Sequence, residues 1–540
     1  DSKIADKLQD FSKLLFRGSL RHSYPHSWRS KAPLIYRNTP QWFISMEKNN
    51  LRKNALKSID ETIFYPPQGQ TRLRSMIETR PDWCVSRQRV WGVPLPLFVN
   101  KKTGQPLRDE NIINRIADIY EKEGSNTWFT EDPQRFLGKD YSIEDYEQVK
   151  DVVEVWFDSG STHAFCLEKR SDLKWPASMY LEGTDQHRGW FHSSLLESCG
   201  TRGKAPYESV LTHGFLVDGK GRKMSKSLGN FISLDDILKK YGVDIIRLWV
   251  VASDYYDDLK VDDAIFKSQA ESYRRIRNTF RFLIGNLNKF NKEEIVDEEQ
   301  FPELEKYMLH RLWEVDQLIK KCIDTFNFHL MFTTLLNFCS NDLSAFYFDI
   351  RKDTVYCDSK VSIVRRSSRT LLDIIFNYLV RWLAPSLSFT CEEAWKSRDN
   401  SNSIHLEDFL SAKKNYCNKD LNNKWNLIKQ VRKVITGALE KERSEKIIGS
   451  SLEAHIDIYL NEKDFLILKD IDFNEISITS SANIHKSINK AVGFSLDEVK
   501  DVSVKVSKAN GNKCQRCWKY QDKLIDNEIC SRCSKVISLQ

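Results

Sequence analysis

The chain has 540 residues, with 82 lysines and arginines against 75 aspartates and glutamates, and therefore a formal net charge of +7. This length allows three or four domains with substantial cores, and the small basic excess permits a nucleic-acid partner without requiring one. No apolar run approaches the roughly 18 residues of a membrane helix, so we expect no membrane partner. The first residues are charged throughout and eight of the 12 cysteines are scattered, so we expect no secretory signal, a reducing compartment and a cytoplasmic protein.

The N-terminal part carries one helical and one extended pattern. Apolar residues recur at helical spacing over residues 1–18 and predict a short amphipathic helix whose stripe serves packing; they are Ile4, Leu8, Phe11 and Leu15. Prolines 25, 33 and 40 then interrupt a strand-like stretch that ends at residues 41–44. Residues 83–99 predict strands that enter a core, and the polar residues 100–150 predict a peripheral insert.

Two short apolar runs predict the strands that carry a ligand site. Residues 152–160, Val-Val-Glu-Val-Trp-Phe-Asp-Ser-Gly, have a buried-strand pattern that ends at a turn. Residues 179–181, Met-Tyr-Leu, predict a second short strand. Because ligands bind at the carboxyl ends of strands in open α/β sheets, we place a substrate pocket after these runs.

The polar and aromatic residues at these positions suit an amino acid as the ligand. Asp185 and Gln186 can accept hydrogen bonds from an ammonium group. Trp156 and Trp190 can wall an apolar slot, because aromatic rings offer a large and rigid area. The alternative for each tryptophan is a plain core residue, and the residues alone favour that alternative.

A basic loop follows at residues 221–230, with the sequence Gly-Arg-Lys-Met-Ser-Lys-Ser-Leu-Gly-Asn. A strand pattern precedes it at 210–217, and Ser233 can cap a helix after it, with Asp236 as the acidic partner. The lysines would neutralise charge that develops on phosphoryl oxygens, and backbone N–H groups would add hydrogen bonds. A solvated basic turn would have the same composition, and composition alone favours that alternative.

From about residue 262 the pattern changes to long helices. The 3.6-residue period predicts them at 303–325, 330–350, 361–383 and 420–443. An earlier helix carries three arginines that could meet an RNA backbone or form a solvated face: Arg274, Arg275 and Arg277. Residues 450–508 alternate apolar and polar side chains and predict a small β-containing domain.

The C-terminal part carries the pattern Cys-x2-Cys-x12-Cys-x2-Cys, formed by Cys514, Cys517, Cys530 and Cys533. Four thiolates at this spacing predict one tetrahedral structural zinc ion, which we prefer to disulfides. Around these cysteines, charge and one stacking face are offered to RNA by Arg516, Trp518, Lys519 and Arg532. By contrast, His187 and His192 lie off one helical face without a nearby cysteine, so we interpret them as structural or ATP-contacting residues.

Three stretches together resemble class I aminoacyl-tRNA synthetases, and among them the isoleucyl-tRNA synthetases of the bacterial type. Residues 223–227, Lys-Met-Ser-Lys-Ser, match the signature loop of the class at every position. The other stretches are residues 83–92, Trp-Cys-Val-Ser-Arg-Gln-Arg-Val-Trp-Gly, and residues 182–191, Glu-Gly-Thr-Asp-Gln-His-Arg-Gly-Trp-Phe. The second of these separates the chain best from valyl and leucyl relatives, and the resemblance runs through nearly the whole chain.

The resemblance implies a fold that is α/β plus all-α. Its parts are the tail of an editing insertion, the second half of a Rossmann-type catalytic domain with the basic loop, an anticodon-binding helical bundle, a small β-containing domain and a zinc knuckle. The boundaries expected for these parts, in the same order, are 1–45, 46–261, 262–445, 446–510 and 511–540.

The resemblance also implies a reaction, in which isoleucine attacks the α-phosphate of ATP and the adenylate is transferred to tRNA(Ile). No protein nucleophile is needed, so catalysis is positioning plus electrostatics, with Mg²⁺ accompanying ATP. Lys226 is the first choice for the cation that stabilises the transition state, Lys223 is the second, and Ser225 completes the ATP-binding set. We expect a monomer.

For the substrate pocket, the resemblance assigns the roles given above to Gln186, Trp156 and Trp190. It also places Glu182 against the isoleucyl-adenylate. Asp185 remains a polar acceptor suggested by its residue type.

One motif of the family is missing from this sequence. The tetrad His-x-Gly-His binds ATP phosphates in the first half of the catalytic sheet, and His22 and His26, separated by Ser-Tyr-Pro, do not match it. We therefore expect a C-terminal part whose partner is the missing N-terminal half, with the body of the editing domain also absent. Editing matters because a pocket discriminates isoleucine from valine by only ~10–200-fold.

Two alternative functions remain. The chain could be a non-catalytic tRNA-binding module, or it could be a valyl or leucyl relative. Residues 185–191 and the zinc knuckle argue against the second alternative.

Overall fold

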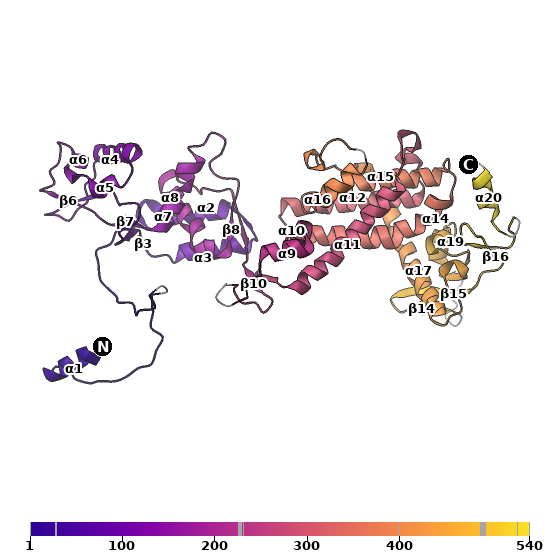
Figure 1. The fold of residues 1–540 in the computed structure, drawn as a ribbon, viewed down its shortest axis with the longest axis horizontal. Helices are drawn as coiled ribbons and strands as arrows, with labels where there is room; N and C mark the ends of the chain where they lie inside the picture. Colours follow the sequence, from indigo (N-terminus) through magenta and orange to yellow (C-terminus); the bar gives the residue numbers. More distant parts are fainter. Residues whose placement is uncertain are drawn as a thin grey trace. The chain divides into compact units, whose positions relative to one another are not determined.

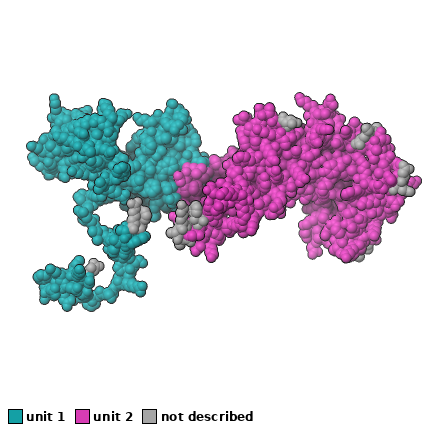
Figure 2. Space-filling model, in the orientation of Figure 1, with its two compact units in different colours: residues 1–180, 185–210 teal, residues 181–184, 211–540 magenta. Residues whose placement is uncertain are grey.

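The computed structural model describes residues 2–27, 30–224, 229–230, 232–398, 400–486, 493–525 and 528–538. The chain divides into two compact units (Figure 1, Figure 2). The first unit holds residues 1–180 and 185–210, and the second holds residues 181–184 and 211–540. The division passes through strands β8 (Tyr180–Gly183) and β9 (Ser209–His213).

Helix α1 (Ser2–Asp10) opens the first unit and buries none of its residues. It is shorter than the predicted helix over 1–18, and Phe11 and Leu15 follow it as exposed side chains. The expectation that this apolar stripe serves packing is therefore wrong for the described structure. Helical spacing alone predicts a helix but not the surface that covers its apolar face.

A three-stranded sheet has the order β2-β9-β8, where β2 spans Ile63–Tyr65. Three helices of the first unit share one core: α2 (Leu51–Glu61), α3 (Gln68–Glu78) and α8 (Trp190–Arg202). Helix α8 is buried on all sides from Phe191 to Cys199, polar residues included. It follows the short 3-10 helix η3 (Thr184–Arg188).

Short antiparallel strand pairs join this core to a peripheral insert. The pairs are β1 (Phe43–Ile44) with β3 (Trp83–Cys84), β4 (Ser86–Arg87) with β7 (Val152–Val153), and β5 (Phe98–Asn100) with β6 (Tyr146–Gln148). The insert has its own core around Trp128 and Phe136. Its helices are α4 (Glu110–Glu123), α5 (Thr127–Thr130) and α6 (Pro133–Leu137).

The predicted strand at 152–160 is only partly correct. Strand β7 ends at Val153, and residues Val155–Gly160 form helix α7, followed by the π-helix η2 (His163–Leu167). Glu154 has extended backbone angles and precedes the helix. A short apolar run does not distinguish a strand from a buried helical turn, which explains the error.

In the second unit, β10 (Leu216–Asp218) pairs in parallel with β11 (Leu259–Val261). Between them lie helices α9 (Leu234–Tyr241) and α10 (Val243–Ala252). Ser233 precedes α9 as predicted, but its side chain makes no capping hydrogen bond.

The long helices predicted after residue 262 are confirmed. They form a bundle with one extended core, and they are α11 (Asp263–Asn286), α12 (Glu303–Asp324), α13 (Phe328–Asn337), η7 (Phe338–Phe348), α14 (Asp349–Cys357), α15 (Ile363–Leu383), α16 (Ser388–Lys396) and α17 (Lys419–Ser444). Short 3-10 helices connect them: η5 (Lys292–Glu294), η6 (Glu298–Gln300), η8 (Ile404–Leu406) and η9 (Lys414–Tyr416). In the described part of the chain, no helix has the length and apolar character to cross a membrane.

The predicted small β-containing region is also confirmed. Its sheet has the order β13-β12-β15-β14, in which β12 is parallel to β13 and antiparallel to β15. The strands are β12 (Ala454–Leu460), β13 (Ser481–Lys486), β14 (Phe494–Leu496) and β15 (Val499–Lys508). The core of this sheet is continuous with that of the bundle. The remaining elements are η10 (Ser451–Glu453), α18 (Glu462–Leu468), α19 (Phe473–Ser477), β16 (Asn512–Lys513), β17 (Tyr520–Gln521) and α20 (Ser531–Ser538).

Candidate functional site

Trp156 and Gln186 meet at Gly189, just before helix α8. A side-chain carbon added to Gly189 would lie 2.6 Å from Gln186 Oε1 and 2.9 Å from Trp156 Cη2. Gln186 Oε1 also accepts a hydrogen bond from the Trp190 backbone N–H at 3.0 Å. The structure therefore brings three of the predicted substrate residues together, and the close approach requires glycine at position 189.

The two predicted tryptophans are held differently. The ring of Trp190 stacks on Tyr180 with centroids 4.0 Å apart, and its Nε1–H donates to the Ser159 carbonyl at 2.9 Å. Trp156 instead leaves 38% of its surface exposed. One ring is thus fixed by stacking and a hydrogen bond, while the other presents an open apolar face that a ligand could cover.

Glu182 and Asp185 lie at and just after the carboxyl end of β8, and both are exposed. Glu182 Oε2 accepts a hydrogen bond from the Gly183 N–H at 3.3 Å. Asp185 Oδ2 accepts one from Gln186 Nε2 at 3.1 Å. The remaining carboxylate oxygens face solvent at the end of the strand where ligands bind in such sheets.

A pocket of about 300 Å³ adjoins Trp156 and Gly189. It is also lined by Arg80, Glu154 and His192. His192 is buried and, among the described residues, neither ring nitrogen has a hydrogen-bond partner. Burial, helped by nearby arginines, lowers the pKa of His192 to about 3, so the ring is neutral at pH 7.

The sequence interpretation missed Arg80 and Glu154 as pocket residues. Glu154 lies in the run 152–160 that was read as a strand, and Arg80 lies three positions before Trp83. Neither residue belongs to a motif, so only the folded arrangement reveals them.

The basic loop is only partly described. Lys223 is exposed and makes no ion pair with the described residues. Lys226 and Ser225, the other predicted ATP-binding residues, lie outside them. Their roles therefore stay predictions.

Asp218, a buried residue at the end of β10, anchors the base of this loop. It accepts hydrogen bonds from the backbone N–H groups of Lys220 and Arg222, at 3.0 and 2.8 Å. Asn230 Nδ2 and Arg222 Nε also donate to it, at 3.0 and 2.9 Å. These donors hold the pKa of Asp218 well below its usual range. Arg222 thus binds Asp218 at the base of the loop, and the sequence did not indicate this contact.

The four C-terminal cysteines form a buried cluster. Their sulfur atoms lie within 4.8 Å of one another, and Sγ of Cys517 and Sγ of Cys530 are 3.8 Å apart. A tetrahedral ion with metal–sulfur bonds of about 2.3 Å separates its ligands by about 3.8 Å, so the geometry fits. Burial would raise the pKa of the Cys514 thiol, but backbone N–H groups, one of them from Cys530 at 3.3 Å, lower it to about 6.

The arginines beside this cluster bind the helical bundle. Arg532 makes a two-pronged ion pair with Asp353 of α14, at 2.6 and 2.7 Å. Arg516 Nη1 donates to the carbonyl of Cys357 at 2.6 Å. These guanidinium groups therefore hold the knuckle against α14, which competes with the predicted role of contacting RNA. Trp518, in contrast, leaves 59% of its surface exposed.

Of the three arginines of α11 that could meet an RNA backbone, two have acidic partners. Arg274 pairs with Glu271 at 2.9 Å, and Arg277 pairs with Glu393 at 3.1 Å. Arg275 is exposed and makes no ion pair within the described residues. Exposed ion pairs contribute only roughly 0–1 kcal/mol to stability, so these pairs do not prevent the arginines from binding RNA. RNA contact by this face therefore stays a prediction.

Helix α8 also buries a carboxyl group at Glu197. Burial, followed by the charges of Asp158 and Glu154, raises the pKa of Glu197 to about 9. The folded chain therefore keeps this proton between pH 4.5 and 9, whereas the unfolded chain releases it. Since the folded state binds more protons in this window, its stability falls as pH rises.

We predict that Glu197→Gln removes this pH dependence. Between pH 5.5 and 7.5 the variant should gain about 1 to 3 kcal/mol of unfolding free energy relative to the original chain, because each pH unit is worth at most about 1.4 kcal/mol. Urea unfolding followed by tryptophan fluorescence at both pH values measures the difference. Glu121→Gln, at an exposed position of α4, is the control, and equal pH profiles for both variants would contradict the prediction.

Comparison with known proteins identifies the family. Residues 6–262 match the family of tRNA synthetases class I (I, L, M and V), and residues 305–458 match the anticodon-binding domain of tRNA ligase. The chain is 58% identical over 520 residues to Isoleucine--tRNA ligase of Pelagibacter ubique (strain HTCC1062), a match that covers 96% of this chain and 56% of that protein. It is 51% identical over 525 residues to Isoleucine--tRNA ligase of Brucella abortus biovar 1 (strain 9-941), covering 96% and 54%.

A solved structure supports the fold independently. Mycobacterium tuberculosis methionyl-tRNA synthetase bound by methionyl-adenylate superposes with a TM-score of 0.50 at 16% identity, covering 71% of this chain and 66% of that one. The chain spans about half the length of the curated relatives it matches. The predicted fold class and family resemblance are confirmed, and the chain belongs to the class I tRNA synthetases.

Proposed function

We propose that the chain is the C-terminal part of an isoleucine–tRNA ligase, which activates isoleucine with ATP and transfers it to tRNA(Ile). The observation that carries this proposal is that Trp156 and Gln186 both approach Gly189, and Gln186 and Gly189 belong to the motif at 182–191 that resembles isoleucyl-tRNA synthetases. The relatives named above support isoleucine as the amino acid.

The substrate slot would use its polar and apolar groups separately. The exposed ring of Trp156 and the fixed ring of Trp190 would contact the branched side chain. The substrate ammonium would donate to Asp185 and to the carboxamide oxygen of Gln186, which already accepts one hydrogen bond and has a second lone pair. Glu182 would contact the isoleucyl-adenylate.

The basic loop would stabilise charge on the phosphoryl oxygens of ATP. Lys226 and Lys223 provide the cations, and Ser225 adds a hydroxyl group. The isoleucine carboxylate is itself the nucleophile, so positioning and electrostatics supply the catalysis, with Mg²⁺ accompanying ATP. The Asp218–Arg222 pair would keep the base of the loop in place.

The knuckle would hold one structural zinc ion through its four cysteines. Zinc supplies folding free energy at such a site, because the deprotonated ligands are brought together only in the folded state. The anticodon-binding bundle and the exposed ring of Trp518 would contact tRNA(Ile). A monomer in the cytoplasm completes the proposal.

We expect the 540-residue chain to show no isoleucine-dependent exchange of pyrophosphate into ATP by itself. It has no His-x-Gly-His tetrad, and its relatives carry nearly as much sequence again. Exchange with isoleucine, valine and leucine, with and without an added N-terminal half, measures this activity. Robust exchange by the chain alone would contradict the expectation, and exchange specific for valine or leucine would reject isoleucine.

In the enzyme completed with its N-terminal half, we expect Lys226→Ala to lower adenylate formation by at least ~10-fold. One charge-directed contact made in the transition state is worth about 2–4 kcal/mol. Pyrophosphate exchange measures the effect, and Lys220→Ala, at an exposed position outside the signature run, is the matched control. An unchanged rate for Lys226→Ala would show that this lysine does not stabilise the transition state.

A further inference from the structure

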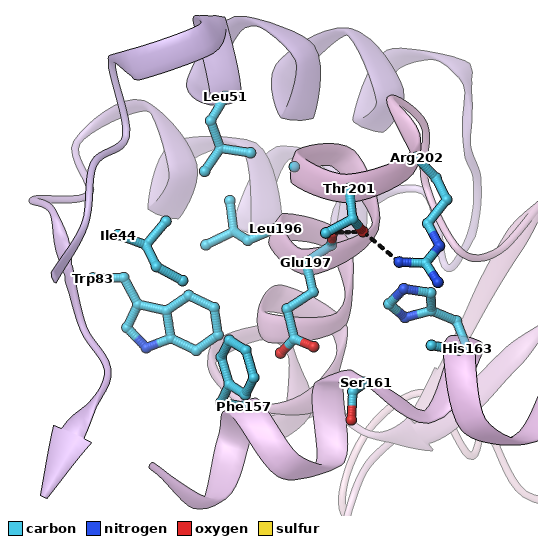
Figure 3. Close-up of a pocket in the computed structure, with 12 residues that line it drawn as sticks. Ile44, Leu51, Trp83, Phe157, Ser161, His163, Leu196, Glu197, Thr201 and Arg202 are labelled. Atoms are coloured by element: carbon cyan, nitrogen blue, oxygen red, sulfur yellow. Dashed lines mark hydrogen bonds between the residues drawn. The ribbon is translucent and has the colours of Figure 1, made fainter. Parts of the chain in front are cut away.

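A second cavity, of about 370 Å³, lies in the first unit on the inner side of α2 and α8 (Figure 3). Most of its wall is apolar and is formed by Ile44, Leu51, Trp83, Phe157 and Leu196. None of the residues predicted for the isoleucine slot lines it. The volume lies at the small end of ligand pockets, so it suits a small molecule.

The carboxyl group of Glu197 forms the polar end of this cavity. Figure 3 shows it between Phe157 and Ser161. Glu197 is only 9% exposed, and among the described residues its Oε1 has no hydrogen-bond partner. A carbon added to Gly160 would lie 2.1 Å from this oxygen, so the backbone there leaves just enough room for the carboxyl group.

His163 is the other buried polar group of the cavity. It is 1% exposed, its Nδ1 lies 3.0 Å from the Gly160 carbonyl, and its Nε2 has no partner in the described part of the chain. A buried polar atom without a partner costs free energy, so both Glu197 and His163 indicate a missing hydrogen-bonding group.

The charges around Glu197 favour a cation as that group. Asp158 and Glu154 both act electrostatically on Glu197. Arg202 is the cation that lines the cavity, but Glu168 binds its guanidinium group at 2.9 and 2.8 Å. Arg202 also donates to Thr201, as Figure 3 shows. The positive charge of Arg202 is thus already compensated. Glu154 has Arg87 as an ion-pair partner at 3.9 Å, whereas Asp158 and Glu197 make no ion pair within the described residues.

We propose that this cavity binds a small organic ammonium ion with an apolar body, whose ammonium group donates a hydrogen bond to the carboxyl group of Glu197. The apolar body would cover Leu51 and Leu196, and the rings of Trp83 and Phe157 would add cation–π attraction. This site does not depend on the proposed ligase activity, because none of the residues assigned to that activity contributes to it.

Binding would change the protonation of Glu197. The free cavity holds this residue as a neutral acid at pH 7. An ammonium ion beside it stabilises the carboxylate, so the carboxyl proton passes to the buffer while the ammonium ion keeps its own protons. About one proton would therefore be released for each ligand bound near pH 7.

Isothermal titration calorimetry of the full chain with 3-methylbutylammonium chloride tests the proposal. Titrations in two buffers with different ionisation enthalpies give the number of protons released. The alcohol 3-methylbutan-1-ol has the same carbon skeleton without the charge and is the matched ligand. We expect it to bind at least ~10-fold more weakly, because it cannot form a charge-assisted hydrogen bond.

Two variants distinguish the contribution of the Glu197 charge to binding from that of the cavity volume. Glu197→Gln should weaken binding of the ammonium ion at least ~10-fold, abolish proton release and change binding of the alcohol by less than about 3-fold. Gly200→Leu should weaken both ligands at least ~10-fold by filling the cavity. A carbon added at Gly200 meets only Leu51 Cδ1, at 3.6 Å, so Gly200→Ala is tolerated and serves as the control.

Three results would overturn the proposal. The first is no binding heat for the ammonium ion at concentrations in the tens of millimolar. The second is equal affinity for the ammonium ion and the alcohol. The third is a Glu197→Gln variant that still binds the ammonium ion as tightly as the original chain. None of these results bears on pyrophosphate exchange, so the ligase proposal would remain standing.

Discussion

Replacing Cys533 by serine is expected to remove the metal from the chain and to unfold residues 514–533 while the rest of the chain stays folded. Cys533 is fully buried within the four-cysteine cluster. Metal binding at structural zinc sites contributes about 10–16 kcal/mol to folding, and a short segment cannot replace that contribution with its own core. Zinc content should fall from about one ion per chain to nearly none, and amide hydrogen exchange should accelerate in the knuckle alone.

The Cys533→Ser change should affect only one of the two steps of the reaction. In the completed enzyme, isoleucine activation should persist in the Cys533→Ser variant while transfer to tRNA falls, because adenylate chemistry needs no group of the knuckle. Cys417→Ser is the control, since Cys417 lies outside the cluster and is half-buried. If the unchanged protein contained no bound metal, the zinc site would be rejected. If activation and transfer fell equally, the claim that the knuckle serves only transfer would be rejected.

The contacts of the knuckle show how it is anchored to the bundle and to the small sheet. Arg532 binds Asp353 of α14, and Arg516 binds the carbonyl of Cys357 at the end of the same helix. The backbone N–H of Tyr520 also donates to Ser480 Oγ, beside the small sheet, at 2.7 Å. Four thiolates and one Zn²⁺ carry a net charge of about −2, which these arginines partly balance. Loss of the metal would therefore also loosen the anchoring of Arg532 and Arg516.

Regular patterns in the sequence predicted much of this fold. Helices with many turns repeat their apolar positions often enough to be recognised, as α12 and α15 show. The cysteine cluster followed from spacing alone, because two cysteines with two residues between them lie close enough to bind one ion. In both cases the information lies within the segment itself.

Contacts between distant segments could not be predicted in this way. The composition of the basic loop gave no sign that Asp218 binds Arg222, and the residues around the cysteines gave no sign that Arg532 binds Asp353. A charged residue looks the same in a sequence whether its partner is water, RNA or a carboxylate. The short run at 152–160 was ambiguous for a similar reason, since its neighbours decide between strand and helix.

The substrate slot was predictable only in part from the sequence, and Gly189 shows why. The motif at 182–191 identified Gln186 and Trp190, but the need for glycine at position 189 appears only in the folded structure. There, Trp156 arrives from helix α7, more than 30 positions earlier in the chain, and occupies the space of a missing side chain. A glycine in a sequence indicates freedom of the backbone, but it does not indicate what approaches it.

We expect Gly189→Ala to lower isoleucine activation by about 100-fold in the completed enzyme, with a raised KM for isoleucine and an unchanged KM for ATP. The new methyl group would lie 2.6 Å from Gln186 Oε1 and 2.9 Å from Trp156 Cη2, so the ring and the carboxamide must move apart. A displacement of about 1 Å at a group that positions the substrate can cost about 100-fold in rate. Pyrophosphate exchange at varied isoleucine and ATP concentrations separates the two KM values.

Gly200→Ala provides the matched control within the same helix. Its added carbon would meet only Leu51 Cδ1, at the ordinary contact distance of 3.6 Å. Alanine is also preferred to glycine inside a helix by about 1 kcal/mol, so this variant should be slightly more stable and fully active. If Gly189→Ala kept its activity, Trp156 would not form a wall of the slot. If both variants lost activity equally, the cause would lie in the folding of α8 rather than in the geometry of the slot.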